Sequence, residues 1–159
     1  MGTDAIDRRT ALAVPILLTA SAADASASTQ SAESVLLQFL RDFENCDLPR
    51  MDSAFAPDAT YFDRSPAVTV ESFEPYRRGR GMPAGMRKLA TELPKTKPGP
   101  PYHRVQPIDL LTQSTGRTAI FTFHLEGEDS LGRRTVVLER RSNGWKIIHI
   151  HASNIQRQG

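Results

Sequence analysis

The chain has 159 residues, of which 39% are hydrophobic and 24% are charged, and its formal net charge is +2 at pH 7. This composition is typical of a single globular domain and excludes a disordered chain. The basic residues are interspersed with acidic ones, and the sequence has no recognised nucleic-acid-binding motif, so we expect no nucleic-acid partner. The single cysteine, Cys46, excludes an intrachain disulfide and an all-cysteine metal site.

The start of the chain has the pattern of an export signal. Two arginines precede an apolar run over residues 11–19, and a stretch rich in alanine and serine follows up to Ala27. The apolar run is much shorter than the ~20 residues that span a bilayer. We predict that residues 1–27 form a twin-arginine-like signal peptide. Residues 28–159 are then one periplasmic or secreted domain, with no membrane association after signal removal. The alternative is an uncleaved flexible tail.

A helix is predicted directly after this segment. Over residues 31–46, Leu36, Phe39 and Phe43 recur at helical spacing, and Ser31 can cap the first turn. These apolar positions give the helix one face that can pack against a sheet.

Shorter elements follow. Residues 49–55 and 82–93 read as two further helices, and residues 59–63 and 68–73 read as short strands. The proline-rich stretch over residues 94–101 is a loop, too short for a linker between domains.

The second half of the chain is a series of strands, expected over residues 105–113, 117–126, 132–141 and 145–153. The pair Asn143-Gly144 is a strong signal for the last hairpin. Three helices followed by a meander of strands predict an α+β domain with its helices on one face of a curved antiparallel sheet.

Two stretches of sequence resemble a known family. Residues 143–153, NGWKIIHIHAS, resemble the last hairpin of the nuclear-transport-factor-2-like (NTF2-like) superfamily, and are most similar to its SnoaL-like and calcium/calmodulin-kinase association-domain branches. Residues 55–62 resemble the junction between helix and first strand. The resemblance covers residues 31–155 and implies a cone, in which three N-terminal helices pack on a strongly bent antiparallel sheet around a pocket.

This resemblance admits several functions. The superfamily includes cyclases, dehydratases, steroid isomerases, binding modules and oligomer hubs, so the fold alone does not decide between them. The interpretation that we favour is an exported domain that binds a small organic molecule in its cone, without a cofactor. Any chemistry would be an isomerisation, cyclisation or hydration, and whether the protein is an enzyme stays open. The alternative is a non-catalytic binding or oligomerisation module. The resemblance also implies a homodimer formed through the sheet.

The last predicted strand carries two histidines. Strict alternation places His149 and His151 on one face together with Trp145, Ile147 and Ser153. Two neighbouring imidazoles suit acid binding or proton relay, and we predict both as catalytic residues. The alternative is structural, with one histidine bonded to the backbone and the other at a rim or interface.

A metal site would need a third ligand beside this pair. His124, Asp63 and Glu139 are the available candidates, and nothing in their spacing requires a metal. We therefore predict none.

Asp63 and Tyr61 are the second pair of predicted catalytic residues. In the isomerase and cyclase branches a pocket carboxylate abstracts a proton next to a carbonyl group, and Asp63 with Tyr61 is the nearest match to that arrangement. The alternative is that Asp63 begins a turn.

Four more residues are predicted to bind the ligand. Trp145 and Phe62 lie beside the catalytic candidates, and His124 lies in a predicted strand. Tyr102, with its neighbour His103, follows the proline-rich loop at the expected pocket mouth.

The sequence departs from the association-domain branch at two positions. That branch has pocket arginines where this chain has Val136 and Ala152. The departure argues against a pocket that binds acid groups.

Overall fold

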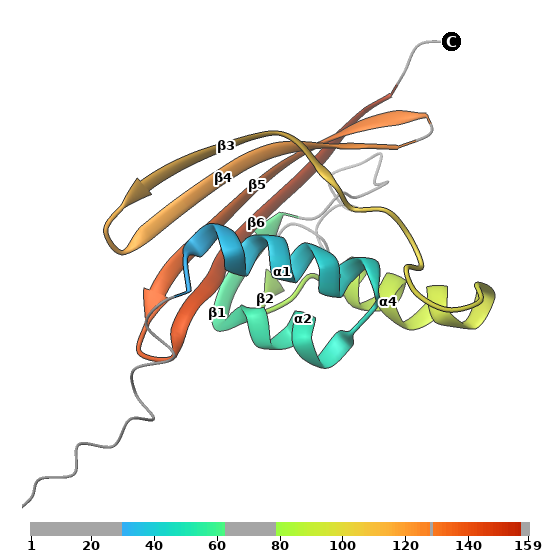
Figure 1. Ribbon diagram of the computed structural model, residues 1–159, viewed down its shortest axis with the longest axis horizontal. Helices are drawn as coiled ribbons and strands as arrows, with labels where there is room; N and C mark the ends of the chain where they lie inside the picture. The colour runs from blue at the N-terminus through green and yellow to red at the C-terminus, as the bar shows by residue number, and fades with distance from the viewer. Residues whose placement is uncertain (1–29, 63–78, 128, 157–159) are drawn as a thin grey trace, which may run out of the picture.

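The computed structural model describes residues 30–62, 79–127 and 129–156 (Figure 1). The predicted export signal, Asp63 and the strand expected over residues 68–73 lie outside these residues. In chain order the elements are α1 (Ala32–Glu44), α2 (Leu48–Ala54), β1 (Phe55–Phe62), β2 (Gly79–Arg80), α4 (Ala84–Thr96), β3 (Pro107–Thr115), β4 (Thr118–Glu126), β5 (Ser130–Arg141) and β6 (Gly144–Gln156). The α+β class predicted from the sequence is confirmed.

Helix α1 forms for the reasons that its sequence suggests. The Ser31 side chain caps the helix by accepting a hydrogen bond from the Ser34 amide at 3.0 Å. Leu36, Phe39 and Phe43 are all buried, so the predicted apolar face is the face that packs. Figure 1 shows α1 lying across one side of the sheet, with α2 and α4 on the same side.

The sheet has six strands among the described residues, in the order β2-β1-β6-β5-β4-β3. Strands β3 to β6 form the predicted antiparallel meander. The expectation of an entirely antiparallel sheet is wrong, because β1 pairs with β6 in the parallel direction. After β1 and β2 the chain crosses to the far edge of the sheet, where β3 lies. The meander then runs back from β3, and its last strand, β6, pairs with β1. The sheet is therefore mixed.

The two faces of the sheet differ sharply in character. The inner face, which the helices cover, carries the buried residues Phe121, Phe123, Val136, Leu138 and Ile150. The outer face is formed by the residues between them in the alternation, which include Thr122, His124, Thr135, Val137, His149 and His151. The inner face and α1 together form the hydrophobic core.

A β-bulge in β6 changes which side chains reach which face. Leu138 pairs with Ile147, whereas the preceding Val137 pairs with His149, so Ile148 is one extra residue in β6. An extra residue reverses the alternation beyond it. Ile147 therefore lies on the inner face before the bulge and Ile150 lies there after it. Simple alternation from Ile147 had predicted the opposite side for everything after Ile148.

Candidate functional site

A cavity of about 370 Å³ lies between α1, the start of α4 and the inner face of the sheet. Its wall is mainly apolar, with Phe39 and Phe43 from α1 and Phe123, Val136 and Ile150 from the strands. This volume is within the usual range for small-molecule sites, which are concave and mostly apolar with a few polar groups. The polar residues of the wall are His103, Arg134 and Arg104, and Arg104 donates from Nη2 to Gln106 Oε1 at 2.8 Å.

His103 is held by the end of α1. Its Nε2 lies 2.8 Å from the carbonyl oxygen of Phe43, and its ring packs edge-on against the Phe43 ring at 4.5 Å. A carbonyl oxygen only accepts, so Nε2–H donates and Nδ1 is the acceptor nitrogen of the neutral imidazole. Burial lowers the pKa of His103 below its ordinary value, against the opposing effects of the Phe43 carbonyl and Glu44. The site therefore holds a neutral histidine near pH 7.

Arg134 brings a positive charge to the opposite wall. Its Nη1 donates to the carbonyl oxygens of Arg133 and Ser153, each at 2.9 Å, and to Asn154 Oδ1 at 3.2 Å. These contacts hold the partly buried guanidinium against β5 and β6. A positioned guanidinium in a low-dielectric wall is suited to a carboxylate or a developing enolate oxygen.

Gly132 makes this placement of Arg134 possible. A Cβ atom at position 132 would lie 2.9 Å from Arg134 Nη1 and 3.1 Å from Arg134 Cζ. Gly132 and Arg134 share the inner face because they are two residues apart on β5. The glycine leaves the space over which the guanidinium folds.

The histidines predicted as catalytic lie on the other side of the sheet. His149 and His151 follow the bulge at Ile148 and point from the outer face, whereas the cavity lies on the inner face. His149 Nδ1 is 2.9 Å from the Thr60 hydroxyl oxygen, and the Phe62 ring lies edge-on to both imidazoles. Burial, followed by the neighbouring His151, lowers the pKa of His149.

The other predicted residues are dispersed. His124 is also on the outer face, with its Nδ1 3.4 Å from Asp109 Oδ2. Phe62 is 47% exposed on that same face. Tyr61 lies on the inner side of β1, but in a separate groove on the other side of the first turn of α4. Asp63, its predicted partner, lies outside the described residues.

Trp145 and Tyr102 complete the predicted set. Trp145 lines a different groove, between the two N-terminal helices and the β5–β6 turn, and the Arg140 guanidinium lies 5.9 Å from its ring centre. Tyr102 uses its backbone instead, donating to the Glu44 carbonyl oxygen at 2.8 Å and accepting from Lys97 Nζ at 2.8 Å. Its neighbour His103 is the residue of the pair that lines the cavity. The structure thus does not gather into one pocket those predicted residues that it describes.

Arg134 is the cavity residue that the sequence analysis missed. Val136 and Ala152 do line the cavity, as the resemblance implied, but Arg134 pairs with Ala152 across the strands and supplies a cation beside them. The signal was present in the alternation, because Arg134 is in phase with the buried Val136 and Leu138. The pocket therefore carries a positive charge although both positions that the resemblance singles out are apolar.

No group of three histidine, cysteine, aspartate or glutamate residues within the described ranges could hold a metal ion. Cys46 is partly buried, and burial raises the pKa of its thiol, which opposes the thiolate form.

The match to a family profile covers most of the chain. Residues 32–156 match the SnoaL-like domain, so the chain belongs to the SnoaL-like family within the NTF2-like superfamily. None of the curated proteins matches the chain. Among the residues described, no helix has the length and apolar character needed to cross a membrane.

Solved structures share the fold at low sequence identity. An NTF2-like protein of unknown function from Pseudomonas putida KT2440 has a TM-score of 0.56 at 20% identity, over 76% of this chain and 82% of its own. A calcium/calmodulin-dependent protein kinase type II association-domain-like protein from Thiobacillus denitrificans has a TM-score of 0.56 at 18% identity, over 78% and 94%. A ketosteroid isomerase-like protein from Parabacteroides distasonis has a TM-score of 0.50 at 20% identity, over 82% and 92%. At these identities the likeness concerns the fold alone.

Proposed function

We propose that this domain binds a small, largely apolar organic molecule in the cavity between α1, α4 and the inner face of the sheet. The observation that carries the proposal is a mainly apolar cavity of about 370 Å³ whose wall includes one neutral histidine, the partly buried guanidinium of Arg134 and a second, exposed arginine, Arg104. The apolar wall favours a hydrocarbon body. Arg134 favours a carboxylate or carbonyl oxygen on it, and His103 Nδ1 favours a hydrogen-bond donor.

The binding test compares acids with their neutral amides. Phenylacetate and cyclohexanecarboxylate are titrated into the protein by calorimetry, each against its amide. We expect both acids to bind more tightly than their amides. Arg134→Gln should weaken acid binding by about 10–100-fold, because a hydrogen bond to a charged group contributes about 1.5–3 kcal/mol.

The chain offers a matched control one residue away. Arg133 is exposed and points from the outer face, so Arg133→Gln removes the same charge without touching the cavity. It should leave acid binding within about twofold, which is about 0.4 kcal/mol. Equal losses in the two variants would show a general charge effect and contradict the assignment of the cavity.

Proton transfer next to a carbonyl group is the chemistry that these residues support. A neutral His103 can accept a proton through Nδ1, and Arg134 can stabilise the enolate oxygen that develops. The reaction class is then a cofactor-free isomerisation, cyclisation or hydration. Deuterium exchange at the α-carbon of cyclohexanone, followed by NMR, tests this. We expect exchange above the imidazole-buffer rate that is lost in His103→Gln; a rate equal to buffer would leave a binding domain without catalysis.

We also propose that two copies associate through the outer face. Among the described residues this face carries four of the five exposed large hydrophobic side chains, which are Phe62, Ile108, Leu111 and Ile155. These side chains are distributed over β1, β6 and β3, so a second copy laid across the outer face would bury all four. Light scattering at micromolar concentration should give a dimer mass, and Leu111→Lys should give the monomer mass. A monomer mass for the unmodified protein would refute the dimer.

Export through residues 1–27 is the last part of the proposal. The paired arginines Arg8 and Arg9 support a twin-arginine route. Expression in a bacterium, followed by fractionation and mass spectrometry, should find a shortened chain in the periplasm or medium. The double change Arg8→Lys and Arg9→Lys should retain the full chain in the cytoplasm, and unchanged export of that variant would contradict the twin-arginine route.

A further inference from the structure

A second groove lies away from the cavity, between α1, α2 and the turn that joins β5 to β6. Its volume is about 250 Å³, below the ~300 Å³ at which sites for drug-sized ligands begin, so it suits a smaller molecule. Of its lining residues, Phe39 alone also lines the cavity described above. The groove is therefore separate from the cavity.

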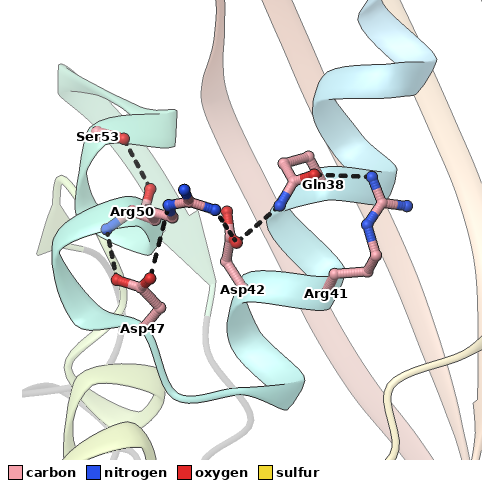
Figure 2. A network of polar contacts seen from close by, with 6 residues as sticks. All are labelled: Gln38, Arg41, Asp42, Asp47, Arg50 and Ser53. Atoms are coloured by element: carbon pink, nitrogen blue, oxygen red, sulfur yellow. Dashed lines mark hydrogen bonds and ion pairs between the residues drawn. The ribbon is translucent and has the colours of Figure 1, made fainter.

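Asp42 is the unusual member of this groove. It is 6% exposed, and it is the one buried charged or polar residue in the part of the chain that the structure describes. A buried carboxylate is costly unless it is well paired. Asp42 Oδ1 accepts one short hydrogen bond, from Gln38 Nε2 at 2.8 Å, and its cationic neighbour Arg50 stays 3.7 Å away (Figure 2). The carboxylate is therefore partnered by Gln38 and Arg50, and it lines an open groove.

The cation beside Asp42 is loosely held. The Arg50 side chain is 67% exposed, and its second acidic neighbour, Asp47, is also distant at 3.6 Å. Figure 2 shows the Arg50 guanidinium between the two carboxylates, on the side of α2 that faces α1. The pair with Asp47 is exposed and contributes little. Asp42 is buried, so Arg50 can turn to a new partner at small cost only if another cation takes its place beside Asp42.

A second cation stands on the far side of the groove. Lys146, at the start of β6, donates from Nζ to the Ser53 carbonyl oxygen at 2.6 Å. The groove therefore holds one buried carboxylate and two cations, Arg50 and Lys146, in its lining. A purely cationic ligand would be repelled by the two cations. A purely anionic ligand would be attracted by them, but it would leave Asp42 without a cation if Arg50 turned towards the ligand.

A molecule with both charges satisfies all three residues. We propose that the groove between α1, α2 and the β5–β6 turn binds a small zwitterionic α-amino acid. Its ammonium group contacts Asp42, and its carboxylate contacts Arg50 and Lys146. The 3.7 Å between Arg50 and Asp42 places opposite charges within the span of one small molecule. Trp145 forms an apolar wall for a short side chain, so glycine and L-alanine are the probes.

The tryptophan makes the test specific to this groove. Trp145 is the single tryptophan of the chain, and it does not line the cavity. We expect glycine and L-alanine to change its fluorescence saturably. Ethylamine and propionate, which each carry one of the two charges, should bind at least about tenfold more weakly at equal ionic strength. No saturable change with either amino acid, or equal affinity for the single-charge compounds, would overturn the proposal.

One substitution with a matched control tests the role of the buried carboxylate. Asp42→Asn keeps the shape of the side chain and removes its charge, and should weaken L-alanine binding at least about tenfold. Asp52→Asn is the control on α2, because Asp52 pairs with Arg87 on α4 at 2.7 Å and does not line the groove. It should bind L-alanine within twofold of the unmodified protein.

A second variant protects the test against misfolding. Arg50→Gln changes a side chain that is two-thirds exposed, so this variant should fold. It therefore remains usable even if circular dichroism shows that Asp42→Asn is misfolded. It should also weaken L-alanine at least about tenfold. Unchanged binding in Arg50→Gln would overturn the proposal. Because acid binding in the cavity is measured by calorimetry with Arg134→Gln, failure of either site leaves the other result readable.

Discussion

The inner and outer faces of the sheet use the same strands for different purposes. On β5, the inner positions Arg134, Val136 and Leu138 close the core and the cavity, while the outer positions Arg133 and Thr135 stay at the surface. Histidine is divided unequally, with His103 at the cavity and the three others on the outer face. In this fold, the face of the sheet on which a residue lies, and not its residue type, decides whether it belongs to the cavity.

The same comparison holds for charge. Arg133 and Arg134 are adjacent on β5, and the alternation of the strand directs Arg134 to the cavity and Arg133 to solvent. Four predictions test how strictly the two faces divide core, site and surface.

The largest effect is expected from neighbouring positions on β4. Phe121 is fully buried on the inner face, and Phe121→Ala should lower the free energy of unfolding by about 3–5 kcal/mol. Thr122 is exposed on the outer face, and Thr122→Ala should change it by about 0.5 kcal/mol or less. Urea unfolding measures both free-energy changes, provided that the dependence of the free energy on urea concentration stays the same. Similar losses at the two positions would break the distinction between the faces.

The second prediction concerns the glycine beneath Arg134. In Gly132→Ala the new methyl group occupies the place of the guanidinium, which must move away. We expect acid binding in the cavity to fall about tenfold, which is about 1.4 kcal/mol, with a smaller change in stability because the end of an arginine side chain is flexible. In the double variant with Arg134→Gln, the loss should not exceed that of Arg134→Gln alone. Additive losses would mean that Gly132 acts independently of Arg134.

The third prediction is a pH dependence with the same sign on both faces. The pKa of His103 and that of His149 are both lowered by folding, so the unfolded chain binds more protons than the folded one below the ordinary histidine value of 6.5. The contribution of these two histidines to the free energy of unfolding should be fully present above about pH 6.5 and should be lost as the pH falls through their lowered pKa values. His103→Gln and His149→Gln should each remove part of this decrease. A stability that rises on acidification from pH 6.5 would contradict both assignments.

The smallest effect is expected at the outer face. Thr60→Val removes the hydrogen bond between the Thr60 hydroxyl group and His149 Nδ1, and Thr60 is exposed. The loss of stability should be about 0.5–1 kcal/mol, and acid binding in the cavity should not change. A tenfold change in acid affinity would show that the histidine pair is coupled to the cavity through the sheet.

Much of the fold was predictable because it depends on local patterns. The spacing of Leu36, Phe39 and Phe43, the cap at Ser31 and the turn at Asn143-Gly144 each act within a few residues. The turn is present in the structure, with Gly144 at a φ of 102°, a conformation that suits glycine. The parallel pairing of β1 with β6 was not predictable in this way, because it joins segments about 90 residues apart.

The candidate site was less predictable than the fold. His103 follows the proline-rich loop, and its position near the mouth of a pocket was expected. Arg134 was missed because the sequence does not show which face of β5 the helices cover, and Arg133 and Arg134 lie on opposite faces. His149 and His151 share a face as predicted, but the bulge at Ile148 turns that face away from the cavity.

The sequence by itself determined the α+β class, the three helices, the meander of strands and the membership of the NTF2-like superfamily. These follow from periodicity, capping and turn residues, which are local properties of the chain. Only the tertiary structure decided which face each polar side chain occupies. The extra residue in β6 shows in the sequence only as a change of phase, from Trp145 and Ile147 to Ile150 and Ala152. In the structure it reverses every side chain beyond it and places the histidine pair on the surface opposite the pocket.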